Sequence, residues 1–117
     1  MAPIDYNQNA ASNGAASCSM TAPSDGAYRV KFVRFHLDNA PIESEEAVLT
    51  IRHAINAKFD VVIWHEDLSL RDGLDANNIN PLPKEEVVLL PGETLEFTYP
   101  NTDANEWGIM IGIEKRD

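Results

Sequence analysis

The sequence predicts an all-β protein, an antiparallel β-sandwich of jelly-roll or immunoglobulin-like topology with an extended N-terminal arm. Three observations lead to this fold class. Apolar and polar residues alternate over residues 93–115, short strand-like segments are separated by turn residues about every ten positions, and no segment shows convincing helical periodicity. Seven or eight short strands with short connections fit two packed antiparallel sheets.

The C-terminal segment carries the clearest alternation. Its apolar residues recur at every second position in two runs, separated by the polar loop of residues 100–106: Leu95, Phe97 and Tyr99, then Trp107, Ile109, Ile111 and Ile113. A period of two places one face of each strand in a core. We therefore expect a closing pair of strands here.

Composition narrows the possible partners. The 117 residues correspond to one domain, and 19 acidic against 9 basic residues give a net charge of −10. Such a charge argues against nucleic acid and anionic membranes as partners, because both need clustered Lys and Arg. There is no apolar run of the ~18 residues that a membrane helix needs, and no signal peptide is apparent. The single cysteine, Cys18, excludes an internal disulfide and is interpreted as a structural thiol.

The first 27 residues differ from the rest of the chain. Sixteen of them are Ala, Ser, Asn or Gly, and none is Lys or Arg. We predict an extended arm over residues 1–16, docked on a neighbouring subunit through Ile4, Asp5 and Tyr6, and a sandwich domain over residues 17–117. The alternative is an arm folded back on its own domain. Alternation over residues 18–22 predicts a short strand that leads into a turn at residues 23–26.

The body of the chain supplies the remaining strands. Tyr28–Leu37 is the longest, and its apolar parity switches at Phe32 and Val33, which indicates a β-bulge or burial of both faces. Residues 47–55 and 59–66 are predicted to form a hairpin across residues 56–58, with Ile55 opposite Phe59. Because residues 59–66 are apolar on both parities, we expect a central strand there. A long loop over residues 67–84 precedes a short strand at residues 86–90.

No set of residues has the spacing of a catalytic motif, so no catalytic residue and no cofactor is predicted. His36, His53 and His65 fall on separate strands, and the predicted register keeps His53 and His65 too far apart to share a metal ion. A loose Ca²⁺ site in the 67–84 loop is an alternative to a solvated polar loop; its oxygen ligands would be Asp67, Asp72, Asp75, Asn77 and Asn78.

Aromatic residues offer one possible ligand platform. Trp64, Tyr99 and Trp107 could stack on a sugar, although core packing is the commoner role of aromatic residues on strands. Trp64 and Trp107 are therefore the candidate ligand or interface aromatics.

Two stretches resemble small β-sandwich proteins encoded among the structural genes of tailed bacteriophages. One is YRVKFVRFHLDNAPIESEEAVLTIRHAINAKFDVVIWHEDLS and the other is LLPGETLEFTYPNTDANEWGIMIGIE. The layout is similar over about residues 17–115: a long strand, a Pro-containing acidic loop, a hairpin, a Pro-Gly-Glu turn, an Asn-Thr-Asp loop and a Trp-Gly closing strand. The sequence INAKF stands where the family has an Ala- and Gly-rich turn.

The resemblance implies a non-enzymatic component of a virion. The first expectation is a capsid decoration or cement protein on the capsid surface, assembled in the host cytoplasm, which binds the lattice of the major capsid protein and forms a homo-oligomer. The alternatives are a minor tail or neck protein, or a β-sandwich module that binds carbohydrate or a receptor. The family carries no functional residue over to this chain.

Overall fold

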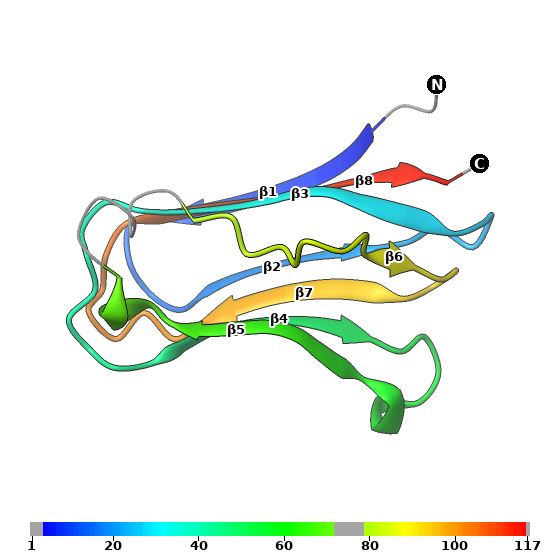
Figure 1. Cartoon of the computed structure of the whole chain (residues 1–117). Helices are drawn as coiled ribbons and strands as arrows, with labels where there is room; N and C mark the ends of the chain where they lie inside the picture. The colour runs from blue at the N-terminus through cyan, green and yellow to red at the C-terminus, as the bar shows by residue number, and fades with distance from the viewer. Residues whose placement is uncertain (1–3, 72–78, 117) are drawn as a thin grey trace.

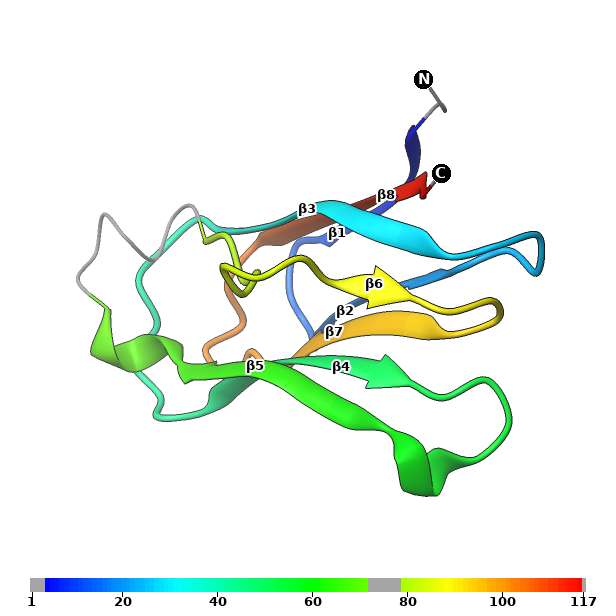
Figure 2. The same ribbon diagram turned by 45° about the vertical axis from the view of Figure 1, so that its right-hand side comes forward.

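The predicted all-β sandwich is confirmed. The structure is a computed structural model that describes residues 4–71 and 79–116, and these residues form two four-stranded antiparallel sheets that face each other (Figures 1 and 2). The strands are β1 (Ile4–Ala11), β2 (Ala16–Thr21), β3 (Tyr28–Leu37), β4 (Glu46–Arg52), β5 (Val61–Asp67), β6 (Val88–Leu89), β7 (Thr94–Tyr99) and β8 (Trp107–Lys115). Two 3₁₀ turns, η1 (Ala57–Phe59) and η2 (Leu68–Leu70), flank β5. In the described part of the chain, no helix has the length and apolar character to cross a membrane.

The strand order selects one of the two predicted topologies. One sheet has the order β1-β8-β3-β6 and the other β2-β7-β4-β5. The first strand therefore pairs with the last, the second with the seventh, the third with the sixth, and the fourth with the fifth. A single long antiparallel hairpin, folded so that its strands alternate between two sheets, produces this pattern. It is the arrangement of a jelly roll.

The core lies between the two sheets and is built from the inward-facing parity of each strand. Phe35 of β3 packs on Phe97 and Tyr99 of β7, with ring centroids 4.6 Å and 5.7 Å apart. The C-terminal alternation behaves as predicted, because its apolar residues are all buried: Leu95, Phe97, Tyr99, Trp107, Ile109, Ile111 and Ile113. These two adjacent segments thus supply seven of the nineteen buried hydrophobic residues in the described part of the chain.

A bulge explains the parity switch of β3. The register against β8 shifts between Val30, opposite Ile113, and Phe32, opposite Gly112. The extra residue moves Val33 onto the core face and Phe32 onto the outer face, where its ring lies over Gly112. The predicted bulge is therefore present.

The N-terminal segment forms a strand of its own domain. Residues 4–11 make β1, which pairs antiparallel with β8 from Ile4 opposite Glu114 to Ala11 opposite Trp107. This is the alternative in which the segment folds back. Side chains of β1 are exposed, apart from the half-buried Ala11, so the backbone ladder holds the strand rather than the core.

The β4–β5 connection differs from the predicted hairpin. Ile51 is opposite Val61, so the connection spans residues 53–60 and contains η1, and the predicted pairing of Ile55 with Phe59 is wrong. The prediction of a central strand at residues 59–66 is also wrong, because β5 is the outermost strand of its sheet. Apolar residues on both parities reflect a bulge in β5, where the register shifts between Leu49 opposite Trp64 and Thr50 opposite Val62.

Candidate interaction surface

The β4–β5 connection lies at one end of the sandwich (Figure 2), and it and the first residues of β5 contain several exposed large apolar residues. Four such residues lie within eight positions of the chain, and their relative exposures are 92% for Ile55, 62% for Phe59, 54% for Val61 and 55% for Val62. We call these four residues the apolar tip. Val61 and Val62 are consecutive residues of β5, opposite Ile51 and Thr50, and therefore face opposite sides of the sheet, so the four residues surround the start of β5 and do not form one flat face. Exposed apolar side chains scattered singly are ordinary on a protein surface, whereas several within eight positions make this end of the sandwich a candidate interaction site.

Hydrogen bonds hold the turn that carries the apolar tip. The Nδ1 atom of His53 accepts hydrogen bonds from the backbone N–H groups of Ile55 (3.2 Å) and Asn56 (3.1 Å). The Oδ1 atom of Asn56 accepts from the N–H of Lys58 at 3.0 Å and so caps η1. These side chains satisfy backbone groups of the turn. The rings of His53 and Phe59 also pack edge to face, with centroids 5.3 Å apart, so an apolar residue contributes to the same arrangement.

Asp60 closes the same turn from the other side. Its Oδ1 accepts from the His53 N–H at 2.7 Å, and its Oδ2 accepts from Arg52 at 3.0 Å. These contacts, first the backbone hydrogen bond from His53 and then the guanidinium of Arg52, lower the pKa of Asp60. Arg52 also donates to Glu96 of β7, at 2.9 Å from its Nε, and so ties the turn to the sheet.

A second turn packs beside the apolar tip. At Gly92, in the β6–β7 connection, the position that a Cβ atom would occupy is 3.1 Å from the Cβ of Ala54. Gly92 has a φ of +81°, a conformation that favours glycine. The neighbouring Leu90 is 58% exposed. Two turns from different parts of the sequence thus lie together and present apolar groups at this end of the molecule.

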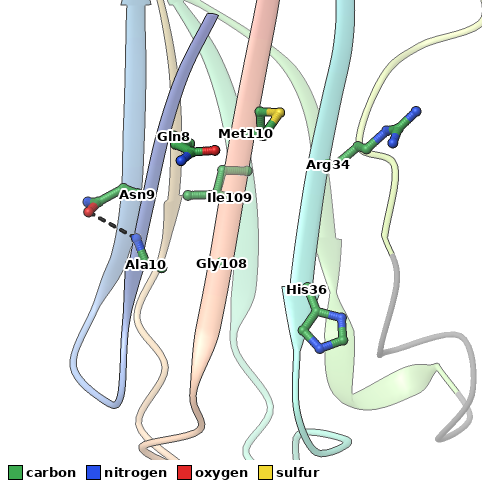
Figure 3. A pocket seen from close by; sticks show the side chains of 8 residues that line it. All are labelled: Gln8, Asn9, Ala10, Arg34, His36, Gly108, Ile109 and Met110. Atoms are coloured by element: carbon green, nitrogen blue, oxygen red, sulfur yellow. Dashed lines mark hydrogen bonds between the residues drawn. The ribbon is translucent and has the colours of Figure 1, made fainter.

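A shallow groove on the outer face of the β1-β8-β3 sheet is the other candidate surface (Figure 3). Its volume is about 490 Å³. Gly108 of β8 lies between Ala10 of β1 and His36 of β3, and the groove forms there because Gly108 has no side chain. In the next row of the sheet, Met110 lies between Gln8 and Arg34. Arg34 lies 5.7 Å from the ring centroid of Phe32, a cation–π contact. The groove therefore carries hydrogen-bond donors over a flat, glycine-containing floor.

The residues predicted for the arm lie on β1. Ile4 and Tyr6 are 43% and 62% exposed, and Asp5 is exposed beside them. The side chains of Asn7 and Asn9 donate to the backbone carbonyls of Ser19 and Ser17 on β2, at 2.8 Å and 3.0 Å. These bonds join the edges of the two sheets within one chain. Docking of residues 4–6 on a neighbouring subunit stays a prediction.

The aromatic platform is not assembled. Trp107 is 4% exposed and Tyr99 is 1% exposed, while Trp64 is half-buried and packs against the core. The Nε1 atom of Trp107 lies within hydrogen-bonding distance of the carbonyl oxygens of Asn13 (3.3 Å) and Gly14 (3.1 Å). The ring of Trp107 is buried and its N–H is close to carbonyl groups of the same chain, so Trp107 packs in the fold and is not accessible for stacking on a sugar.

The Asn-Thr-Asp loop, residues 101–103, also serves the fold. Asp103 accepts hydrogen bonds from the backbone N–H groups of Ile42 (2.8 Å) and Glu43 (3.1 Å). Glu45 in turn accepts from the N–H and hydroxyl of Thr102, both at 2.7 Å. The two acidic loops are thereby joined to each other.

The histidines do not converge. His36 lines the groove, His53 caps the turn, and the Nδ1 of His65 lies 2.7 Å from the Oε2 of Glu46 on the neighbouring strand. Among the described residues, no group of three or more His, Cys, Asp or Glu side chains could hold a metal ion. Asp67 of the proposed Ca²⁺ loop accepts from the N–H of Ser69, whereas Asp72, Asp75, Asn77 and Asn78 lie outside the described residues.

Sequence reasoning missed the apolar tip. Its signal was present in INAKF, a turn without glycine that is flanked by apolar residues on both parities. The prediction of a central strand at residues 59–66 assigns those apolar residues to the core, and so it does not identify them as part of a surface.

Comparison with known proteins does not assign the chain. No protein-family model matches the sequence, and no curated protein matches it.

Proposed function

We propose that this chain is a non-enzymatic structural protein of a tailed-bacteriophage particle, a decoration or cement protein that binds the lattice of the major capsid protein. The observation that carries the proposal is the apolar tip, a local group of exposed apolar side chains on a protein with a net charge of −10. A protein whose working state is an assembly leaves such surfaces to be covered by its neighbours.

The fold is compatible with this role. Jelly rolls occur in viral capsid and lectin domains and in cupins, so the fold alone does not select among these functions. The hydrogen-bonded turn favours association, because a backbone already held in one conformation loses less conformational entropy when a partner covers it. The sequence resemblance to phage structural proteins adds an independent reason to favour a particle component.

Reconstitution tests the proposal. Purified protein is mixed with phage heads that lack it, and bound protein is measured after sedimentation. We expect copies in numbers comparable to the capsid subunits and a higher temperature of head disruption. Binding of only a few copies would indicate a tail or neck protein, and no binding to any particle would reject the virion role.

Variants of the tip link the binding to the surface. Phe59→Lys and Val62→Lys place a charge on the apolar tip and are expected to weaken head binding. Ile42→Lys is the matched control, because Ile42 is 85% exposed and lies in the β3–β4 loop at the other end of the sandwich (Figure 1). All three variants change the net charge equally, so a loss confined to Phe59 and Val62 cannot be a charge effect of the whole protein.

The groove favours a second candidate, a carbohydrate-binding module. Gln8, Arg34 and His36 supply polar groups around a flat floor, a composition suited to sugar hydroxyls. Binding of host-surface glycans, lost in Arg34→Ala and unchanged in Phe59→Lys, would favour this role over the assembly role.

A further inference from the structure

The turn between β1 and β2 contains Asn13 and Gly14, the only asparagine–glycine pair in the sequence. We propose that Asn13 is a site of spontaneous covalent modification, in which its side-chain amide becomes a carboxylate through a cyclic imide. The isomerised product weakens the end of the sandwich to which this turn belongs. The inference does not rest on the virion role, because it follows from the turn and its contacts.

The reaction joins two groups of the same turn. The backbone nitrogen of Gly14 loses its proton and attacks Cγ of Asn13, the C–N bond of the side-chain amide breaks, and ammonia leaves. Water then opens the resulting imide ring at either of its carbonyl carbons. Opening at Cγ gives aspartate, whereas opening at the main-chain carbonyl gives isoaspartate, whose main chain runs through Cβ and Cγ. Water is the only co-reactant.

Both reacting groups are accessible. Asn13 and Gly14 are exposed, and in the described part of the chain no hydrogen bond is found for the Asn13 side chain or the Gly14 N–H. A Cβ atom placed on Gly14 would have no atom within 4 Å, so the space around the nitrogen is open to the attacking geometry and to water. Because glycine has no side chain, it also allows the turn to change conformation during ring closure.

Other sites of similar sequence are less suited to the reaction. Asp25 also precedes a glycine, but its carboxylate accepts hydrogen bonds from the Tyr28 hydroxyl at 3.0 Å and from Nζ of Lys115 at 3.3 Å. Asn39 is exposed but precedes an alanine, whose methyl group hinders approach to the backbone nitrogen. The modification is therefore expected at Asn13 first.

The turn holds two buried side chains of the β7–β8 region. The carbonyl oxygens of Asn13 and Gly14 lie 3.3 Å and 3.1 Å from Nε1 of Trp107, and the Gly14 carbonyl also accepts from Nδ2 of Asn101 at 2.8 Å. Isoaspartate lengthens the main chain by one carbon and converts the former Asn13 carbonyl into a carboxylate outside the main chain. Both carbonyls are then displaced, and buried donors lose acceptors.

The two products differ in their effect on the fold. Aspartate keeps the length of the main chain and adds only one negative charge at an exposed position. Isoaspartate adds the same charge and also changes the main chain. A loss of stability that is confined to isoaspartate therefore comes from the displaced carbonyls and not from the charge.

Ageing of the full chain tests the site. The protein and a synthetic peptide of residues 9–17 are incubated together at mildly alkaline pH, and mass spectrometry of digested samples follows the replacement of ammonia by water. We expect loss of intact Asn13, with aspartate and isoaspartate both present at this position, while Asn39 stays intact. Intact Asn13 in the folded protein after the peptide has been converted would overturn the proposal.

Asn13→Gln is the matched control. It keeps a side-chain amide in the turn, but its extra methylene group requires a larger ring, so residue 13 should remain unmodified over the same period. Release of ammonia from residue 13 at an equal rate in this variant would reject the imide route.

Thermal unfolding of the separated products tests the effect on the fold. Ion exchange separates the modified protein by its added charge, and peptide mapping identifies the isoaspartate fraction. That fraction is expected to melt at least ~3 °C below the unaltered protein, whereas Asn13→Asp, which reproduces the aspartate product, should melt within ~1 °C of it. Equal melting temperatures for the isoaspartate fraction and Asn13→Asp would overturn the structural part of the proposal.

Discussion

The Nδ2 atom of Asn101, in the β7–β8 loop, donates a hydrogen bond of 2.8 Å to the carbonyl oxygen of Gly14, which lies 87 positions earlier in the β1–β2 turn. The same Nδ2 donates to the carbonyl of Asn105 at 2.9 Å, and Asn101 is 3% exposed. One buried amide thus joins two loops at the same end of the sandwich. Asn101 has a φ of +55°, a conformation that asparagine tolerates better than most residues.

Replacement of Asn101 is therefore expected to destabilise the fold. Asn101→Ala removes the buried hydrogen bonds and places at positive φ a residue that tolerates this conformation less well than asparagine, which should lower the free energy of unfolding by about 2–3 kcal/mol. Denaturant unfolding measures the loss. Asn101→Gly is the control that relieves the backbone conformation; if it restores full stability, the hydrogen bonds contribute nothing.

We expect the folded protein to lose stability at alkaline pH because of Tyr99. Burial raises the pKa of its hydroxyl from 10.0 to about 12, with the negative charges of Glu45, Asp103 and Asp67 acting in the same direction. Below pH 10 both folded and unfolded tyrosine keep the proton. Between about pH 10 and pH 12 the unfolded chain ionises first, so stability falls by roughly 2–3 kcal/mol.

The Tyr99→Phe variant tests whether ionisation of the Tyr99 hydroxyl causes the loss of stability at alkaline pH. The Tyr99 hydroxyl is buried without a hydrogen-bond partner among the described residues. The phenylalanine variant should be at least as stable at pH 8, and denaturant unfolding from pH 8 to pH 12 should show a smaller decline. An unchanged decline would assign the alkaline loss to other groups.

The close contact between Gly112 and the Phe32 ring predicts that the stability effects of substitutions at these two positions depend on each other. A methyl group added at Gly112 would overlap the Phe32 ring, which covers this position on the outer face of the sheet. Gly112→Ala should cost about 1–3 kcal/mol in the native protein. In a Phe32→Ala background the same change should cost much less, and equal costs in the two backgrounds would show that the ring does not press on Gly112.

Asp60 predicts acid sensitivity of the β4–β5 turn. Its folded pKa is lowered from 3.8 by the backbone N–H of His53 and then by Arg52. A lowered folded pKa means that the stabilisation is present above pH 3.8 and is lost as the pH falls through the folded value. Hydrogen exchange of the His53 amide should quicken in that range, whereas in Asp60→Asn its rate relative to the intrinsic rate should be independent of pH there.

We expect the fold to tolerate deletion of strand β1. Removal of residues 1–11 takes away a backbone ladder and, among the described residues 4–11, no fully buried side chain. It leaves Asn13 and Gly14, which hold Trp107. The shortened chain should remain folded with a moderately reduced melting temperature, as followed by circular dichroism. If it unfolds, β1 is an essential part of the domain; if it folds but loses head binding, residues 4–6 take part in docking.

Local patterns determined the strands. The apolar alternation from Leu95 to Ile113 predicted the closing strands and their buried face, because a period of two can be read without knowing what the strand packs against. The parity switch at Phe32 indicated a bulge or burial of both faces, and the register shift in β3 shows the bulge. The net charge, the single buried Cys18 and the short strand over residues 18–22 were also accessible from the sequence.

Only the tertiary structure decided strand order, edge positions and exposure. The pairing of β1 with β8 joins the two ends of the chain, and alternation contains no information about which strand is the neighbour. Residues 59–66 look like a central strand in sequence, yet β5 is an edge, so Val61 and Val62 are exposed. Trp64 and Trp107 are both aromatic residues on predicted strands, but Trp107 is buried whereas Trp64 is half-buried. Burial depends on contacts between distant segments, and for this protein that dependence separates a core residue from a candidate interface.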